Sequence, residues 1–106
     1  MPLPFDDEHA PLYSVGQVAA MLGVQPAFVR RLDVENVVEP TRSPGGQRRY
    51  SQVEIAQVQH VSQMASEGMT LAGIRRILAL EAEVADLERQ LATLRAKSPK
   101  HRADRR

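Results

Sequence analysis

The segment from residue 14 to residue 34 constrains the fold most, because it carries the start and stop signals of two short helices. Ser14 with Gln17 forms a capping-box pattern, and apolar residues then follow at helical spacing. Gly23 suits the left-handed conformation that ends a helix, and Pro26 suits the first position of the next helix. Two short helices joined by a turn of about three residues form a helix-turn-helix pattern, whose second helix enters the major groove of DNA.

The second predicted helix separates an apolar face from a basic one. Val29 and Leu32 are spaced to face the core of a small domain. The opposite side of the helix then carries Ala27, Arg30 and Arg31. A basic helix face beside such a turn favours contact with nucleic acid.

Residues 36–50 predict a small β-hairpin, because a Gly-Gly pair stands between two short candidate strands. The alternative interpretation is an ordinary surface loop. Three arginines fall within eight residues here, namely Arg42, Arg48 and Arg49. Their nearness to an arginine-bearing helix favours a wing that lies along a phosphate backbone.

Two further helices are predicted after the hairpin. Ser51 with Glu54 forms a second capping box, and the helix that it begins ends before Gly68. Thr70 caps the next helix. The pattern leaves open whether residues 70–96 form one helix or two.

An apolar stripe with alternating spacings of three and four follows. It consists of Ile77, Leu80, Val84, Leu87, Leu91 and Leu94. Strict alternation favours a seam between two helices over one amphipathic helix that packs on its own domain. We therefore predict a coiled coil over residues 77–97 that joins two copies of the chain, with Leu80, Val84, Leu87, Leu91 and Leu94 as dimerisation contacts.

The charges beside the stripe favour antiparallel helices. A parallel pair would set Glu83 against Glu88 of the other helix, and these charges repel. An antiparallel pair centred between residues 87 and 91 would bring Glu81 near Arg95. Each such pair contributes only about 0.2–1 kcal/mol, which is enough to decide orientation when the apolar layers are similar.

Composition narrows the possible functions. The 106 residues suit one domain with an appendage, and the absence of cysteine excludes disulfides and thiolate metal sites, so we predict no metal and no cofactor. No apolar run approaches the ~20 residues of a membrane span, so we predict a cytoplasmic protein without a membrane partner. The three histidines are scattered and no nucleophile motif or phosphate loop is present, which argues against an enzyme.

The two ends of the chain differ in charge. Residues 1–12 are acidic and proline-rich, and we expect a disordered lead rather than a secretory signal. Residues 98–106 are basic and are expected to be disordered as well. Such a tail is either a solvated end or an arm for phosphates.

Residues 13–51, YSVGQVAAMLGVQPAFVRRLDVENVVEPTRSPGGQRRYS, resemble the DNA-binding domain of the MerR superfamily. The segment VEIAQVQHVSQMASEGMTLAGIRRILALE resembles the second helix pair of that family, so the match covers residues 13–81. GGQRRYS and GMTLAGIRRILALE are most similar to its actinobacterial heat-shock repressor (HspR-like) branch. The resemblance implies a winged helix-turn-helix, an antiparallel coiled-coil dimer and binding to inverted repeats. The branch also implies a chaperone as co-regulator.

By position, the resemblance implies that Gln25, Ala27 and Arg30 lie at the major groove and that Arg48 lies in the wing. The full set of predicted DNA contacts is Gln25, Ala27, Arg30, Arg31, Arg42, Gln47, Arg48, Arg49 and Tyr50. Arg31 and Leu32 stand where the family usually has aromatic residues, so the base preference of the family is not carried over.

We thus predict a mostly α fold, with a winged helix-turn-helix domain of four helices and a small β-hairpin over residues 13–76 and a coiled-coil helix over residues 77–97. The predicted function is a sequence-specific DNA-binding regulator, a repressor or autoregulator, that binds double-stranded DNA as a homodimer. The alternative is an adaptor whose coiled coil binds another regulatory protein, such as a sigma factor.

Overall fold

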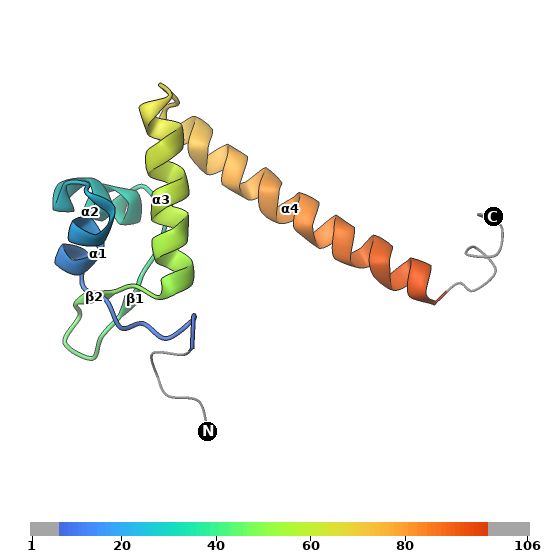
Figure 1. Cartoon of the computed structure of the whole chain (residues 1–106), viewed down its shortest axis with the longest axis horizontal. Helices are drawn as coiled ribbons and strands as arrows, with labels where there is room; N and C mark the ends of the chain where they lie inside the picture. The colour runs from blue at the N-terminus through green and yellow to red at the C-terminus, as the bar shows by residue number, and fades with distance from the viewer. Residues whose placement is uncertain (1–6, 98–106) are drawn as a thin grey trace. The chain divides into compact units, whose positions relative to one another are not determined.

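The computed structural model describes residues 7–97, and Figure 1 shows the order of their helices and strands along the chain. By its internal contacts the chain divides into two compact units between Arg75 and Arg76. The predicted basic tail over residues 98–106 lies outside the described residues, as does the first half of the predicted lead. No helix among the described residues has the length and apolar character of a membrane span.

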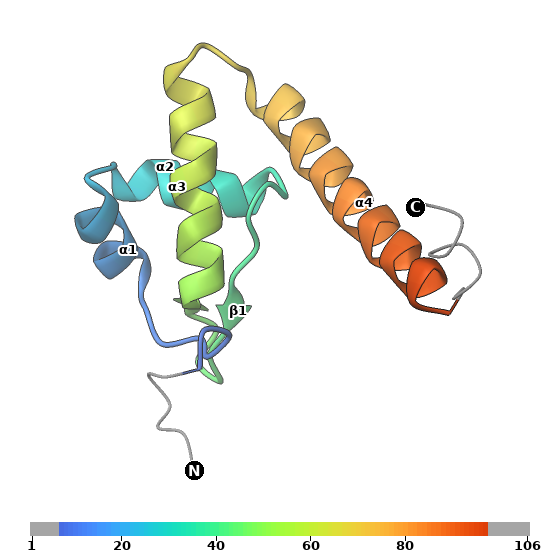
Figure 2. The same cartoon turned by 45° about the vertical axis from the view of Figure 1, so that its right-hand side comes forward.

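The helix-turn-helix forms as predicted. Helix α1 spans Val15–Leu22, and α2 spans Pro26–Val34 with its proline in the first turn. The capping box of α1 is present, because the Gln17 amide donates to Ser14 Oγ at 3.2 Å and the Ser14 amide donates to Gln17 Oε1 at 2.8 Å. Gly23 ends α1 in the left-handed conformation, with φ of 67°. The two helices pack against each other and lie beside α3 (Figures 1 and 2).

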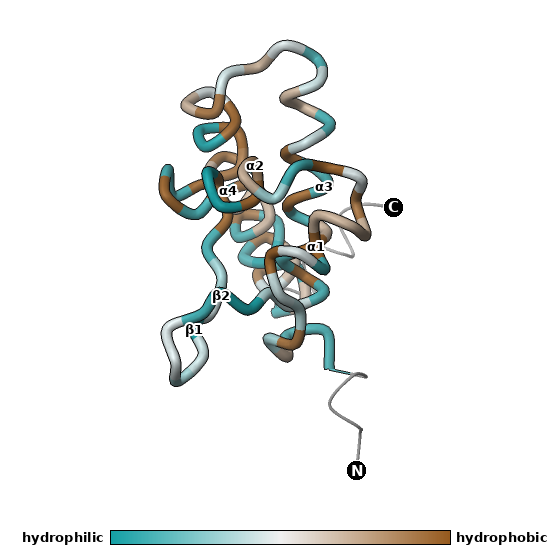
Figure 3. The backbone as a smooth tube through the Cα atoms, turned by 90° about the vertical axis from the view of Figure 1, so that its left-hand side faces the viewer, coloured by the Kyte–Doolittle hydropathy of each residue, from teal (hydrophilic) through white to brown (hydrophobic). Residues whose placement is uncertain are grey.

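The predicted hairpin is also confirmed. Strand β1 (Thr41–Arg42) pairs antiparallel with β2 (Arg48–Arg49), and Arg42 stands opposite Arg48 in the register. The loop between the strands is closed by the Ser43 amide, which donates to the Gln47 carbonyl oxygen at 2.8 Å. The hydropathy colours of Figure 3 show this hairpin as hydrophilic to neutral along its length.

The later helices settle the question that the pattern left open. Helix α3 spans Gln52–Ser66 and carries the predicted capping box of Ser51 and Glu54. Helix α4 spans Leu71–Ala96 without interruption, so residues 70–96 form one helix and not two. The Thr70 hydroxyl accepts a hydrogen bond from the Gly73 amide at 3.1 Å, as expected of a cap.

The core lies among α1, α2, α3 and the first turns of α4. Its buried apolar side chains are Val18, Ala19, Val29, Leu32, Val38, Tyr50, Ile55, Val58, Val61, Met64 and Ile74. The helical residues of this set recur at helical spacing on the inner faces of their helices, and Val38 and Tyr50 come from the segments between helices. Burial of these faces is why short helices with modest propensity are stable here.

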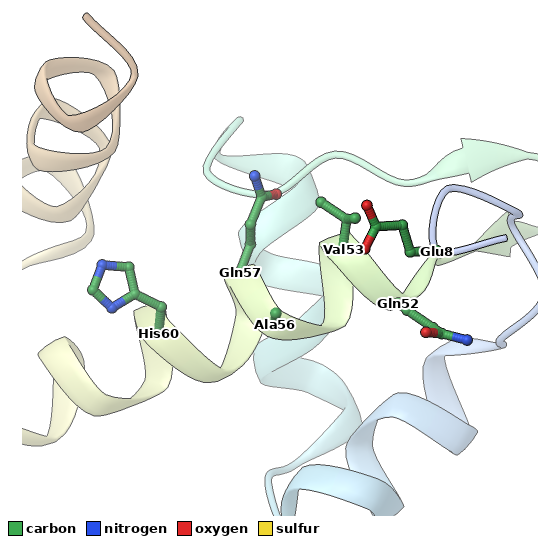
Figure 4. Close-up of a pocket in the computed structure, with 6 residues that line it drawn as sticks. All are labelled: Glu8, Gln52, Val53, Ala56, Gln57 and His60. Atoms are coloured by element: carbon green, nitrogen blue, oxygen red, sulfur yellow. The ribbon is translucent and has the colours of Figure 1, made fainter. Parts of the chain in front are cut away.

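Residues 7–12 differ from the predicted disordered lead. The Glu8 carbonyl oxygen accepts from the Val53 amide at 3.1 Å, and the Leu12 amide donates to the Tyr50 carbonyl oxygen at 3.1 Å. Figure 4 shows the Glu8 side chain beside the start of α3. The physical reason is that the first amides of a helix have no partner within it, and the chain before α1 supplies one.

Candidate nucleic-acid interface

Helix α2 exposes the face that the sequence assigned to DNA. Val29 and Leu32 are fully buried, which turns Ala27, Arg30 and Arg31 outward, and all three are exposed. Gln25, the residue before the helix, is exposed as well.

The two arginines of this face differ in their partners. Arg31 Nε donates to Glu35 Oε2 at 2.6 Å, one helical turn further on. Within residues 7–97, Arg30 has no hydrogen-bond or ion-pair partner. Its five N–H donors are therefore the most available on this helix for a base edge.

The two arginines that face each other across the hairpin share one carboxylate. Arg42 Nη2 donates to Asp33 Oδ2 at 2.8 Å, and Arg48 Nε donates to the same oxygen at 2.7 Å. The Arg42 side chain is 51% exposed and that of Arg48 is 22% exposed, whereas Asp33 is only 14% exposed. The wing is thus tied to the last turn of α2.

The remaining wing residues form a second small network. Arg49 Nη2 donates to Gln47 Oε1 at 2.8 Å, and Arg49 Nη1 donates to the Arg48 carbonyl oxygen at 3.0 Å. Gln47 is exposed and Arg49 is half-buried.

A hollow brings the wing and the start of α1 together. Its lining residues are Ser14, Val15, Gly16, Arg42, Gly46, Gln47, Arg48 and Arg49. Figure 1 shows the hairpin next to the beginning of α1. Three guanidinium groups and the amide end of a helix favour an anion such as a DNA phosphate. Sequence reasoning missed the contribution of residues 14–16, for which the capping box was the only available signal.

Tyr50 does not belong to this surface. Its side chain is 0% exposed, and its hydroxyl is buried without a hydrogen-bond partner in the described structure. Burial and the nearby Asp33 charge raise the pKa of Tyr50 to about 12, although Arg48 and Arg42 act in the opposite direction. The prediction that Tyr50 contacts DNA is therefore corrected, because a side chain held in the core cannot reach a ligand outside it.

The predicted dimerisation residues are exposed on α4 in the second unit. Their exposed fractions are Leu80 42%, Val84 54%, Leu87 55%, Leu91 46% and Leu94 65%. An apolar stripe of this length on a helix favours burial against another surface.

A second hollow lies on α3 and is lined by Glu8, Gln52, Val53, Ala56, Gln57 and His60 (Figure 4). It contains no arginine or lysine, so it does not have the charge of a phosphate site.

Comparison with known families decides between the classes that this geometry allows. Residues 13–81 match the model of the MerR HTH family regulatory proteins. The chain belongs to the MerR family. This match agrees with the limits inferred above from the resemblance, and it covers α1, α2, the hairpin, α3 and the start of α4.

Individual MerR-family relatives support the same assignment. Over 90 residues the chain is 39% identical to HspR of Streptomyces coelicolor. The aligned residues make up 84% of this chain and 60% of HspR. It is 26% identical over 76 residues to the transcriptional regulator GlnR of Bacillus anthracis, and these residues make up 72% of this chain and 59% of GlnR. The chain thus spans about 60% of the length of the curated relatives that it matches.

Two solved structures share the fold. A MerR-family transcriptional regulator from Bacillus cereus aligns over 86% of this chain and 72% of its own, with a TM-score of 0.58 and 20% identity. The N-terminal part of MtaN, the multidrug transporter activator of Bacillus subtilis, aligns over 88% of this chain and 95% of its own, with a TM-score of 0.58 and 23% identity.

Proposed function

We propose that this MerR-family chain is a cytoplasmic, sequence-specific DNA-binding regulator that binds an inverted repeat as a homodimer and represses transcription. The observation that carries the proposal is the exposed face of α2, where Arg30 has no partner among the described residues, beside a hollow lined by three wing arginines.

The residues of the interface take different roles. Arg30 reads a base edge, where a bidentate contact with guanine contributes about 1–3 kcal/mol of discrimination. Ala27 lies on the same side of α2 as Arg30, and Gln25 is exposed just before the helix; both contact neighbouring bases in this proposal. Arg31 and the wing arginines contact phosphates, which set the register of the protein on the duplex without reading sequence.

Dimerisation follows from the stripe on α4. Each leucine or valine of the stripe that becomes fully buried contributes about 1.5–3 kcal/mol. The antiparallel arrangement is preferred because it places Glu81 near Arg95 of the second copy. Disulfide crosslinking tests the orientation, since the chain has no native cysteine. A mixture of Leu87→Cys and Leu91→Cys chains should crosslink to each other, and self-crosslinking of Leu91→Cys alone would contradict the antiparallel register.

Selection of bound duplexes from a random library tests the DNA-binding function. Recovery of an inverted repeat supports a dimer on DNA, and recovery of nothing above background contradicts the proposal. Repression is tested separately, because transcription from a promoter with the selected repeat should fall when the protein is added.

The role of Arg30 needs a matched control. Arg30→Ala should weaken binding to the selected repeat and reduce its preference over random DNA about 10-fold or more, which corresponds to the discrimination of one bidentate contact. Arg89→Ala removes the same charge from the exposed side of α4 and should leave the preference unchanged. Equal losses on both duplexes for Arg30→Ala would refute its role in base recognition.

The alternative function is an adaptor that binds a sigma factor, or a repressor that needs a chaperone as co-regulator. Two observations keep the adaptor as the alternative: the formal net charge is only +1, and two wing arginines pair with Asp33 inside the chain. A duplex-binding assay at modest salt separates the adaptor from the DNA-binding regulator.

A further inference from the structure

Asp33 holds two arginines that belong to different strands. Arg42 and Arg48 are register partners in the hairpin, so their side chains lie on the same face of it. Both donate to the same oxygen, Asp33 Oδ2, at 2.8 and 2.7 Å. We call these three residues the wing clamp.

The wing needs this carboxylate for its order. Like charges directly opposite each other destabilise a strand pair, and two strands of two residues each are marginal by themselves. The Asp33 side chain is 14% exposed and that of Arg48 is 22% exposed, so solvent screens their contact less than it screens a surface pair. The wing clamp therefore joins the hairpin to α2.

The clamp leaves donors for a second anion. Arg48 uses only Nε toward Asp33, and a guanidinium has five N–H donors in a fixed fork. The same two arginines line the hollow beside the start of α1. A phosphate in that hollow would therefore meet guanidinium groups that Asp33 already orients, close to a carboxylate that repels it.

We propose that Asp33 is a positioning residue that sets the selectivity of this protein for its operator. It fixes the wing relative to the recognition helix, and its negative charge weakens the attraction of the wing to phosphates of any sequence. This inference rests on the proposed DNA-binding function. It predicts that the loss of Asp33 strengthens non-specific binding and lowers selectivity.

Asp33→Asn tests the proposal, because it keeps the size of the side chain and removes its charge. Affinity for random duplex should rise several-fold. The slope of log affinity against log salt concentration should steepen by the amount expected for up to about two additional phosphate contacts. The ratio of operator to random affinity should fall about 10-fold. Glu39→Gln removes the same charge from an exposed residue outside the wing clamp and should leave the ratio unchanged. An unchanged ratio in Asp33→Asn, or weaker random binding, would overturn the proposal.

Measurements without DNA separate this inference from the proposed function. In nitrogen-15 NMR spectra, the Arg48 Nε–Hε signal should shift in Asp33→Asn, and the Ser43 and Gly46 amides that close the wing should exchange faster with solvent. Glu39→Gln should change neither. If the wild type binds no duplex, the DNA-binding function fails. The positioning role of Asp33 is then judged from these NMR signals alone. An unchanged Arg48 signal and unchanged amide exchange in Asp33→Asn would refute it.

A second variant covers the case in which Asp33→Asn does not fold. Arg48→Lys keeps the positive charge but lacks the Nε–H donor that contacts Asp33. It should loosen the wing amides and lower the operator-to-random ratio. Wild-type selectivity in Arg48→Lys would contradict a positioning role for the clamp.

Discussion

Tyr50→Phe should change the stability of the protein at high pH more than at neutral pH. Burial, followed by the Asp33 charge, raises the pKa of Tyr50 from 10.0 to about 12, so the folded protein holds the phenol proton more tightly than the unfolded chain does. The stabilisation from this shift is fully present below pH 10 and is lost as the pH rises through 12. Two pKa units correspond to about 3 kcal/mol of unfolding free energy.

Phenylalanine has no proton to lose and leaves no buried hydroxyl without a partner. At neutral pH, Tyr50→Phe should therefore be as stable as the wild type or more stable, by on the order of 1 kcal/mol. Between pH 10 and 12, the wild type should lose about 2–3 kcal/mol more than the variant.

Urea unfolding at a series of pH values, followed by circular dichroism, measures this difference. All other ionisable groups are the same in both proteins, so their effects cancel in the comparison. Tyr13→Phe is the control, because Tyr13 is partly exposed and its backbone pairing with Tyr50 does not need the hydroxyl. The chain has two tyrosines and no tryptophan, so tyrosinate absorbance reports the titration directly. An equal loss of stability in wild type and Tyr50→Phe would refute the reasoning.

Three stability changes follow from local geometry, each measured by urea unfolding. Asn36 has φ of 57°, so Asn36→Ala should cost about 1 kcal/mol while Asn36→Gly is close to neutral; equal costs would contradict backbone strain as the cause. Ser51→Ala removes the cap that accepts from the Glu54 amide and should cost about 0.5–2 kcal/mol, and a smaller loss would show that the cap is dispensable. Ile74→Ala empties a fully buried site and should cost about 2–5 kcal/mol, whereas a loss under 1 kcal/mol would place Ile74 outside the core.

Much of the fold could be predicted because its signals are local. The capping boxes at Ser14 and Ser51, the glycine after α1 and the Gly-Gly pair of the wing each act within about four residues of chain. Such a signal specifies the same local backbone conformation regardless of where the segment lies in the folded domain. The helix-turn-helix was therefore predicted with nearly the limits that the structure has, and the hairpin was predicted within residues 36–50, where its strands are 41–42 and 48–49.

The candidate site was predicted less completely. The outward side of α2 follows from helical period alone, and Arg30 and Arg31 lie on it as expected. Tyr50 was assigned to DNA because of its neighbours in sequence, whereas the fold buries it completely. Tyr50 directly follows β2 and pairs through an isolated bridge with Tyr13, and so short an extended segment does not indicate from its sequence which side meets the core.

Capping signals and helical period in the sequence were enough to place the starts of α1, α2 and α3 and the basic outward side of α2, whereas the continuity of α4 was known only from the structure. The partners of the wing arginines, in contrast, depend on how the chain folds in three dimensions. Asp33 and Arg48 are 15 positions apart in the chain, and several carboxylates could have paired with Arg48. A charge in a sequence does not specify its partner, because the partner is the group that packing brings within hydrogen-bond distance. For the same reason, the ordering of residues 7–12 appeared only when α3 offered them its unpaired first amides.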